Sequence, residues 1–202
     1  MGSHYFDVDP SVPLEKRSVS LTVDGRELTL ASGRGVFSWQ RVDLGTAALI
    51  RYAPQPPAGD VLDLGCGYGP ITVALALRAP GSRIWAVDVN RRALDLTREN
   101  AASLGAANVE AVEADQVPED LRFAAIYSNP PIKVGKDVLR ELMLHWLPRL
   151  LPDGHAYLVV KQSMGSESLT RWLGEHGWQV ERLRSKSGYR ILDVSAAQAE
   201  TG

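Results

Sequence analysis

Apolar and polar residues alternate in the first part of the chain. The segments 19–23 and 27–30 place apolar residues at every second position, and Asp24-Gly25 separates them. This alternation around a two-residue Asp-Gly link predicts a β-hairpin with one face turned to a core. Residues 33–38 are expected to form a flexible link. Residues 43–52 have a helical spacing, which the Pro- and Gly-rich segment that follows should end.

From residue 60 onward, short apolar runs are separated by helical spacings. Strands are predicted at 61–64, 83–88, 109–113, 123–128 and 155–161, with helices at 71–78, 91–104, 137–150 and 167–176. This order predicts a mostly parallel sheet with helices on both faces. Two final strands, 178–183 and 189–194, are joined by a link too short for a parallel crossover. They should therefore form an antiparallel hairpin.

The predicted fold class is α/β. We expect a seven-stranded, mostly parallel sheet that ends in an antiparallel hairpin, together with a small β-hairpin extension at the N-terminus. A chain of 202 residues is the size of one structural domain. Within it we expect an arm, hairpin and helix at 1–58, a core at 59–195 and a flexible tail at 196–202.

Composition limits the functional classes. The formal net charge of -2 shows no overall basic surplus, so any contact with nucleic acid must come from a local basic patch. The single cysteine excludes an internal disulfide. No apolar run approaches the ~20 residues that span a bilayer, and the first residues lack a signal-peptide pattern. We therefore expect a cytoplasmic protein with no membrane partner.

The stretch 61–70 combines a buried strand, three alternating glycines and a helix start. Without a Cβ, Gly65, Gly67 and Gly69 let the backbone approach a ligand, and the free N–H groups of the first helical turn point towards it. A dinucleotide loop would carry its third glycine where this chain has Pro70. The pattern therefore predicts a site for a polar ligand and disfavours a nicotinamide cofactor.

The residues of this loop, Asp-Leu-Gly-Cys-Gly-Tyr-Gly from Asp63 to Gly69, resemble the adenosylmethionine loop of the class I methyltransferases, which have a Rossmann-like fold. The resemblance implies that the glycines pass the methionine moiety of the cofactor and that Asp63 lies near its amino group. Cys66 stands in the middle of the loop, where it is expected to border the cofactor; a small side chain is sufficient there and no catalytic thiol is expected. The alternative is a glycine-rich turn that binds nothing.

Acidic residues follow the next two strands. Asp88, one βα unit after the glycines, can accept hydrogen bonds from both ribose hydroxyls of a nucleotide, and the neighbouring Val89 is also expected to border the cofactor. This position suits either cofactor class, and an acid there can also cap a helix, although Asn90 is better placed as the cap. The methyltransferase resemblance implies that Asp115, after the third strand, accepts a hydrogen bond from the adenine amino group.

The tetrapeptide Asn129-Pro130-Pro131-Ile132 follows the fourth strand directly, at the strand ends where ligands bind in such sheets. An exocyclic amine on a planar base is a poor nucleophile, because its lone pair is delocalised into the ring. The Asn129 side-chain oxygen and the Pro130 carbonyl can each accept one N–H and aim the lone pair at a sulfonium methyl. Asn129 is also expected to border the cofactor. The alternative is that Asn-Pro-Pro only ends the strand.

Further matches extend the resemblance to the small methyltransferase group, which includes the bacterial 16S rRNA guanine-N2 methyltransferases. The matching segments are residues 128–136, His4-Tyr5-Phe6, residues 35–38 and residues 42–46. The resemblance implies that Phe37 and Thr46 border the cofactor. Ile132 stands where Asn-Pro-Pro enzymes commonly carry an aromatic residue that stacks on the target base, and short members of the group often carry isoleucine there.

The functional prediction is an adenosylmethionine-dependent N-methyltransferase that acts on guanine N2 in 16S rRNA and releases adenosylhomocysteine. Other possible substrates are a tRNA adenine, a protein glutamine and a small metabolite. An alternative from another class is a non-catalytic module that binds adenosylmethionine or RNA. The intact Asn-Pro-Pro argues against such a module, which has no use for those acceptors. We expect ribosomal RNA or a ribosomal subunit as the partner, and a monomer or weak homodimer.

Basic side chains near the same strand ends are candidates for contacts with RNA. They are Lys133 and Lys136 after the Asn-Pro-Pro segment, and Arg184, Lys186 and Arg190 on the terminal hairpin. A solvated face is the alternative interpretation. The apolar stripe within 139–150 is predicted to be core. The histidines lack metal-ligand spacing, so we expect no metal.

Overall fold

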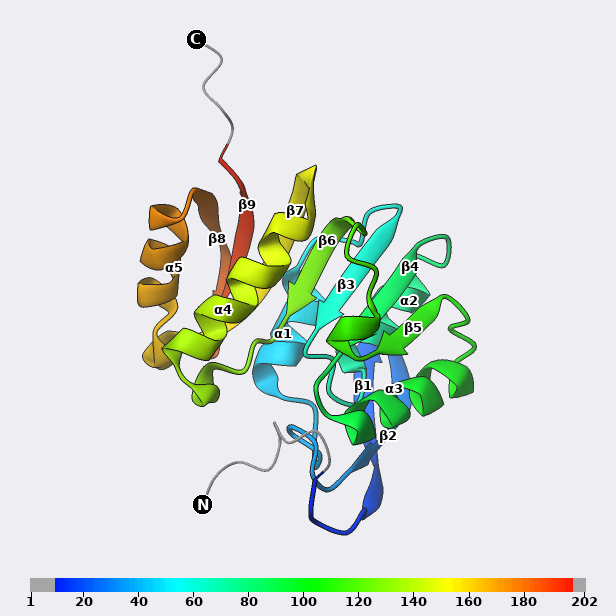
Figure 1. Cartoon of the computed structure of the whole chain (residues 1–202). Coiled ribbons are helices and arrows are strands. Elements are labelled where there is room, and N and C mark those ends of the chain that lie inside the picture. Colours follow the sequence, from blue (N-terminus) through cyan, green and yellow to red (C-terminus); the bar gives the residue numbers. More distant parts are fainter. Residues whose placement is uncertain (1–9, 198–202) are drawn as a thin grey trace.

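The computed structural model describes residues 10–197, in which seven strands form one large sheet and two form a separate hairpin (Figure 1). Residues 1–9 and 198–202 lie outside this described part, and so does the predicted motif His4-Tyr5-Phe6. The arrangement confirms the predicted α/β fold with a mostly parallel sheet. No helix in the described part is long and apolar enough to span a membrane.

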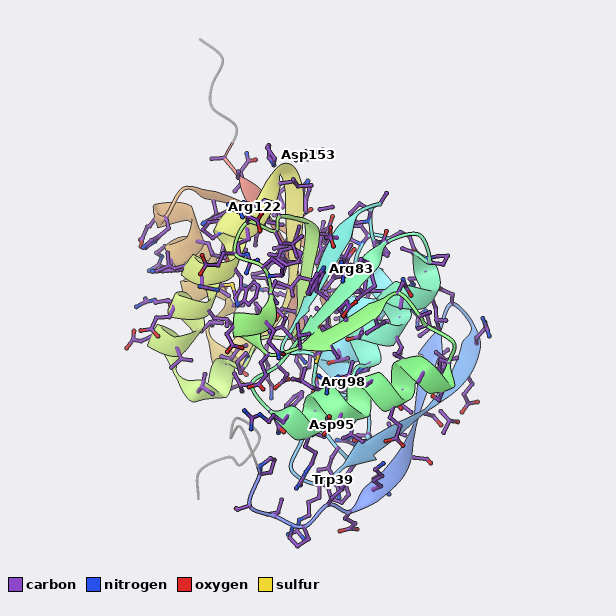
Figure 2. The ribbon with its side chains drawn as sticks, turned by 45° about the vertical axis from the view of Figure 1, so that its right-hand side comes forward. Trp39, Arg83, Asp95, Arg98, Arg122 and Asp153 are labelled. Carbon is purple, nitrogen blue, oxygen red and sulfur yellow. The ribbon has the colours of Figure 1, made fainter. Side chains whose placement is uncertain are left out.

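The N-terminal hairpin pairs β1 (Lys16–Val23) with β2 (Arg26–Gly33) in antiparallel register, as predicted. Asp24 and Gly25 have positive φ angles of 48° and 81°, as a two-residue turn between twisted strands requires. The apolar face of the hairpin packs into the core beside the first three helices. Figure 2 shows Trp39, in the segment after β2, beside this hairpin.

The large sheet has the strand order β5-β4-β3-β6-β7-β9-β8. Its strands are β3 (Asp60–Leu64), β4 (Arg83–Val87), β5 (Val109–Val112), β6 (Phe123–Ser128), β7 (Leu150–Lys161), β8 (Trp178–Lys186) and β9 (Tyr189–Ala196). The first five pair in parallel, whereas β9 pairs antiparallel to both β7 and β8. The chain leaves the central strands β3 and β6 towards opposite edges of the sheet, so a crevice forms at their carboxyl ends.

Helices cover both faces of this sheet (Figure 1). They are α1 (Leu44–Tyr52), α2 (Pro70–Arg78), α3 (Arg91–Ser103), α4 (Lys136–Trp146) and α5 (Ser166–Glu175). The first three share one core with the hairpin, in which Leu49 and Val73 are fully buried. On the other face, α4 and α5 bury Met143 and Leu173 against the sheet. The sheet and its two helical layers therefore form a three-layer structure.

Several boundaries differ from the sequence prediction: β1 and β2 of the hairpin and β8 are each about three residues longer than predicted, and the differences in α4, β7 and β9 have identifiable causes. The helix predicted to extend to residue 150 ends at Trp146 and continues as a short 3-10 turn, because Pro148 has no N–H to donate. β7 begins at Leu150 instead of 155, and it pairs with the start of β6 across a register shift. Ala196, which was predicted to begin the tail, is the last residue of β9.

The link at 33–38, predicted to be flexible, is anchored at several points. The Arg34 N–H donates to the Glu15 carbonyl at 3.0 Å, and Val36 is fully buried. Asn90, which caps α3 as predicted, donates its side-chain N–H to the Gly35 carbonyl at 2.8 Å. These bonds hold the link against the start of α3, where it forms one wall of the cavity described below.

Candidate active site

The glycine loop between β3 and α2 is held against the end of β4. The N–H groups of Gly65 and Cys66 donate to the Val87 carbonyl at 2.8 and 3.1 Å, and the Gly67 N–H donates to Asp88 Oδ2 at 2.9 Å. Gly65 and Gly67 have φ angles of 76° and 59°, and a Cβ on either would meet no atom within 4 Å. Both therefore offer bare backbone to an open space.

Gly69 and Cys66 lie on the side of the loop that packs against Thr97 of α3. A Cβ on Gly69 would lie 2.9 Å from Thr97 Oγ1, so this glycine lets the start of α2 approach α3. Pro70 is the first residue of α2. Cys66 is buried with its Sγ 3.6 Å from Thr97 Oγ1, and burial raises the pKa of its thiol well above the ordinary value. A thiol that stays protonated fits the expectation that Cys66 is not a nucleophile.

Two acidic residues flank the loop. Asp63 is fully buried in β3, where Thr72 Oγ1 donates to its Oδ2 at 2.5 Å and its Oδ1 has no partner within the described residues. This burial raises the pKa of Asp63 to about 7. Asp88 accepts the N–H groups of Gly67 on Oδ2 and of Asn90 on Oδ1, both at 2.9 Å. Burial also raises the pKa of Asp88.

The segment after β6 reaches the same edge of the sheet. Ser128 Oγ donates to the Leu64 carbonyl at 2.7 Å and joins the ends of β6 and β3. Pro131, with φ -75° and ψ 72°, is the centre of an inverse γ-turn in which the Ile132 N–H donates to the Pro130 carbonyl at 2.8 Å. A carbonyl oxygen has two lone pairs, so Pro130 keeps one for another donor.

Asn129 is held by the start of α1. Its Nδ2 donates to Asp43 Oδ2 at 3.0 Å and to Thr46 Oγ1 at 2.9 Å. Asp43 is the N-cap of α1, and its other oxygen, Oδ1, accepts from the Tyr189 hydroxyl at 3.3 Å. Since both amide hydrogens have acceptors, the Asn129 side-chain oxygen is the atom left for a ligand.

One cavity of about 410 Å³ joins these parts of the structure. Its walls come from the link after β2, the glycine loop, the segments that follow β4 and β6, and α4, with the end of β7 and the start of β9. The predicted site residues that line it are Phe37, Gly65, Gly67, Asp88, Val89, Asn129, Pro130, Pro131 and Ile132. The structure thus brings the glycine loop and the Asn-Pro-Pro segment together in one space.

The remaining residues predicted to contact the cofactor do not line the cavity. Thr46, Asp63, Cys66 and Gly69 lie behind its walls, where they support the residues that do. Asp115 is exposed in the short 3-10 turn after β5, and the neighbouring Ala114 lines the cavity instead.

Among the basic residues predicted to contact RNA, those whose side chains the structure describes also lie outside the cavity. Lys136 is exposed at the start of α4, and Arg184 and Lys186 are exposed on β8. The Arg190 guanidinium instead donates to Ser166 Oγ and Glu167 Oε1 of α5, each at 3.1 Å. The side chain of Lys133 lies outside the described part of the chain.

Several lining residues were missed by the sequence prediction. They are Val36, Ser38, Asp43, Leu64, Val87, Asn90, Ala93, Ala114, Lys161, Met164 and Tyr189, together with Leu142 and Trp146 from the stripe predicted to be core. Lys161 ends β7 beside β6, so the rule that placed Asn129 at the strand ends also indicates this lysine. No local signal connects Asp43 with Asn129, 86 residues later. Within residues 10–197, no group of three or more His, Cys, Asp or Glu side chains is arranged to hold a metal ion.

The chain is similar to several known proteins. A family model described as the methyltransferase small domain matches residues 27–193. The uncharacterized protein YbxB of Bacillus subtilis (strain 168) is 35% identical over 196 residues, which cover 95% of this chain and 98% of that protein. Ribosomal RNA small subunit methyltransferase C of Pseudomonas aeruginosa (strain LESB58) is 32% identical over 193 residues, which cover 92% of this chain and 56% of that protein.

A solved structure has a similar fold. It is the T. thermophilus 16S rRNA N2 G1207 methyltransferase (RsmC) in complex with AdoMet and guanosine, with a TM-score of 0.74 and 26% sequence identity. The match covers 94% of this chain and 52% of that one. The chain therefore spans nearly the whole length of the Bacillus protein but about half the length of the two rRNA methyltransferases.

Proposed function

The chain belongs to the methyltransferase small domain family, and on that premise we propose that it methylates an exocyclic amino group of an RNA base with adenosylmethionine as the methyl donor. The proposed target is guanine N2 in 16S rRNA. The rRNA methyltransferases of P. aeruginosa and T. thermophilus, to which the chain is similar, support this choice. Action on ribosomal RNA would place the protein in the cytoplasm.

The residues of the glycine loop suit this cofactor in two respects. Gly65 and Gly67 border open space that any side chain would enter, and the buried Oδ1 of Asp63 has no partner in the described structure. We propose that Gly65, Gly67 and Asp88 hold adenosylmethionine, with the Asp88 oxygens directed to the ribose hydroxyls. The buried Asp63 carboxylate then attracts the amino group of the cofactor from behind the loop. When bound there, the cofactor supplies an electrophilic methyl group on its sulfonium. An orphaned carboxylate oxygen beside a bare loop is a suitable partner for an amino group.

The observation that carries the proposal is the single cavity that the glycine loop shares with residues 129–132. In it, the Asn129 side-chain oxygen and the second lone pair of the Pro130 carbonyl are two acceptors for the two hydrogens of one amine. Accepting both draws the amine towards tetrahedral geometry and frees its lone pair for attack. Catalysis then depends on positioning and hydrogen bonding, and the surrounding apolar walls strengthen both bonds.

Part of the cavity lining is suited to a planar base. It consists of Ile132, Leu142, Trp146 and Met164, which are apolar side chains. Stacking of a base on an aromatic side chain contributes ~1–3 kcal/mol in proteins that bind single strands. Trp146, however, is only 2% exposed and packs against Phe123. We therefore propose that the base instead packs on the aliphatic side chains of Ile132 and Leu142.

Outside the cavity, exposed cations are available for the RNA backbone. Arg184 lies over the Tyr52 ring at 5.1 Å, and Lys186 lies beside the turn that leads to Tyr189 at the cavity wall. We propose that these two and Lys136 contact phosphates near the target base. Arg190 is less suited to a phosphate contact, because its guanidinium is already paired with Glu167.

A methyl-transfer assay tests the function directly. The protein should transfer radiolabelled methyl groups from adenosylmethionine to unmodified 16S rRNA or 30S subunits, and nuclease digestion should release N2-methylguanosine. Transfer only to tRNA, to a protein glutamine or to a small metabolite would show that this molecule is the substrate and that 16S rRNA is not. Adenosylhomocysteine binding without transfer to any substrate would indicate a non-catalytic module.

An Asn129→Ala variant tests the site. The loss of one of the two acceptors should lower kcat by about 100-fold or more, as the loss of one preorganised hydrogen bond does in other enzymes. The affinity for adenosylhomocysteine should change little, because the glycine loop is untouched. A variant that turns over at the wild-type rate would show that Asn129 does not hold the amine.

A further inference from the structure

The N-terminal cap of α1 bonds directly to the Asn129 side chain. Asp43 Oδ2 accepts the backbone N–H groups of Gly45 at 2.8 Å and Thr46 at 3.2 Å, and also Asn129 Nδ2 at 3.0 Å. Thr46 Oγ1 accepts from the same Asn129 nitrogen at 2.9 Å. One carboxylate oxygen therefore links the start of a helix to the amide that borders the cavity.

These contacts decide which way the amide of Asn129 faces. The side-chain amide of asparagine has two ends of similar shape: an oxygen that accepts hydrogen bonds and an NH₂ group that donates two. A hydroxyl such as Thr46 Oγ1 can donate or accept, so it tolerates either orientation. The Asp43 carboxylate accepts only, so a flipped amide would place two oxygens against each other and lose a charge-assisted hydrogen bond.

The flipped orientation would also be chemically wrong for the proposed reaction. It would present N–H donors to an amine that itself carries N–H donors, and the amine would lose its acceptor. We propose that Asp43 is a positioning residue that keeps the Asn129 oxygen turned towards the substrate amine. This proposal rests on the proposed function and extends it from the two acceptors to the group that orients one of them.

The neighbouring residues hold Asp43 in the required position. A Cβ on Gly45 would lie 2.7 and 2.8 Å from ring atoms of Tyr189, so the glycine lets that ring pack on the first turn of α1. The Tyr189 hydroxyl then donates to Asp43 Oδ1 at 3.3 Å and leaves Oδ2 for the amide. Burial and the nearby Asp43 raise the pKa of Tyr189, so its hydroxyl stays a donor at neutral pH.

Two substitutions at one position separate orientation from helix capping. Serine, asparagine and aspartate cap helices about equally well. In Asp43→Ser the hydroxyl can cap α1 but is too short to reach Asn129. In Asp43→Asn the side-chain oxygen can do both, and its amide can donate to the Tyr189 hydroxyl. We expect kcat to fall about 100-fold in the serine variant and to be largely restored in the asparagine variant. Adenosylhomocysteine affinity and thermal stability should stay close to wild type in both.

An NMR measurement reports the orientation without any methyl transfer. The side-chain amide signals of Asn129, assigned by their loss in Asn129→Ala, should be protected from exchange in the wild type and in Asp43→Asn. In Asp43→Ser they should shift and exchange faster. These signals show whether the Asp43 contact forms in solution.

The outcomes separate this proposal from the proposed function. Wild-type kcat in Asp43→Ser with shifted amide signals would overturn the positioning role, and so would a loss of kcat with unchanged signals. A loss of kcat that Asp43→Asn fails to restore, although its amide signals match those of the wild type, would also overturn it. If the wild type methylates no RNA but the signals respond as expected, the proposed function fails while the orienting contact stands.

Discussion

Asp63 should make the stability of the ligand-free protein fall as pH rises. Its carboxyl is fully buried with one oxygen unpartnered, and burial raises its pKa from the ordinary 3.8 to about 7. The folded state therefore binds this proton more tightly than the unfolded chain does. This contribution of Asp63 to the free energy of unfolding is fully present below pH 3.8 and is lost as the pH rises through about 7. The total corresponds to about 4 kcal/mol, of which about 3 kcal/mol falls between pH 5 and pH 8.

The substitution Asp63→Asn isolates this contribution, because asparagine has the shape of the protonated acid and can still accept the Thr72 hydroxyl bond. Titrating groups that do not interact with Asp63 act equally in both proteins and cancel in the difference, whereas Asp88, whose charge helps to raise the Asp63 pKa, contributes to it. Urea unfolding at pH 5, 6, 7 and 8 should show the variant gaining about 3 kcal/mol relative to the wild type across this range. Stability curves that stay parallel from pH 5 to pH 8 would refute the claim that a buried, uncompensated charge develops at Asp63.

Two further predictions concern the glycine loop and the RNA surface. Both Gly65→Ala and Gly69→Ala should lower the free energy of unfolding by about 1–2 kcal/mol, because both positions have left-handed backbone. The second change should cost more, because its methyl group would press on Thr97; equal losses in urea unfolding would contradict this contact. Reversing the charges of Arg184 and Lys186 to Glu should weaken RNA binding and reduce its salt dependence, with adenosylhomocysteine binding unchanged. Filter binding at two salt concentrations measures this effect, and unaltered affinity would place the RNA on another face.

Local patterns were sufficient to predict most of the fold. The Asp24-Gly25 link fixed the N-terminal hairpin, and apolar runs interrupted by helical spacings indicated the parallel sheet. The start of β7 was missed because its first residues pair with β6 only across a register shift, which depends on a distant strand. The end of α4 was predictable in principle, since Pro148 cannot continue a helix, but the apolar stripe through residue 150 outweighed this signal.

The candidate site could be predicted only where its residues follow a strand directly. Gly65, Asp88 and Asn129 each come within a residue of a strand end, and parallel strands bring such positions to one edge. Asp43 caps α1 and Tyr189 begins β9. The contact between them therefore depends on how these two distant elements pack. The local cap signal of Asp43 accounts for its bonds to α1 but contains no information about Asn129.

The position of β9 between β7 and β8 has a consequence for synthesis. During translation β8 is made before β9, yet in the described sheet its neighbour is β9. Until β9 emerges from the ribosome, β7 presents an unpaired edge of the kind that promotes aggregation. The contact of Tyr189 with Asp43 spans 146 residues, so it forms late. The cavity is therefore among the last parts of the molecule to be completed, and a nascent chain that stalls before residue 189 has neither a protected sheet edge nor a closed cavity.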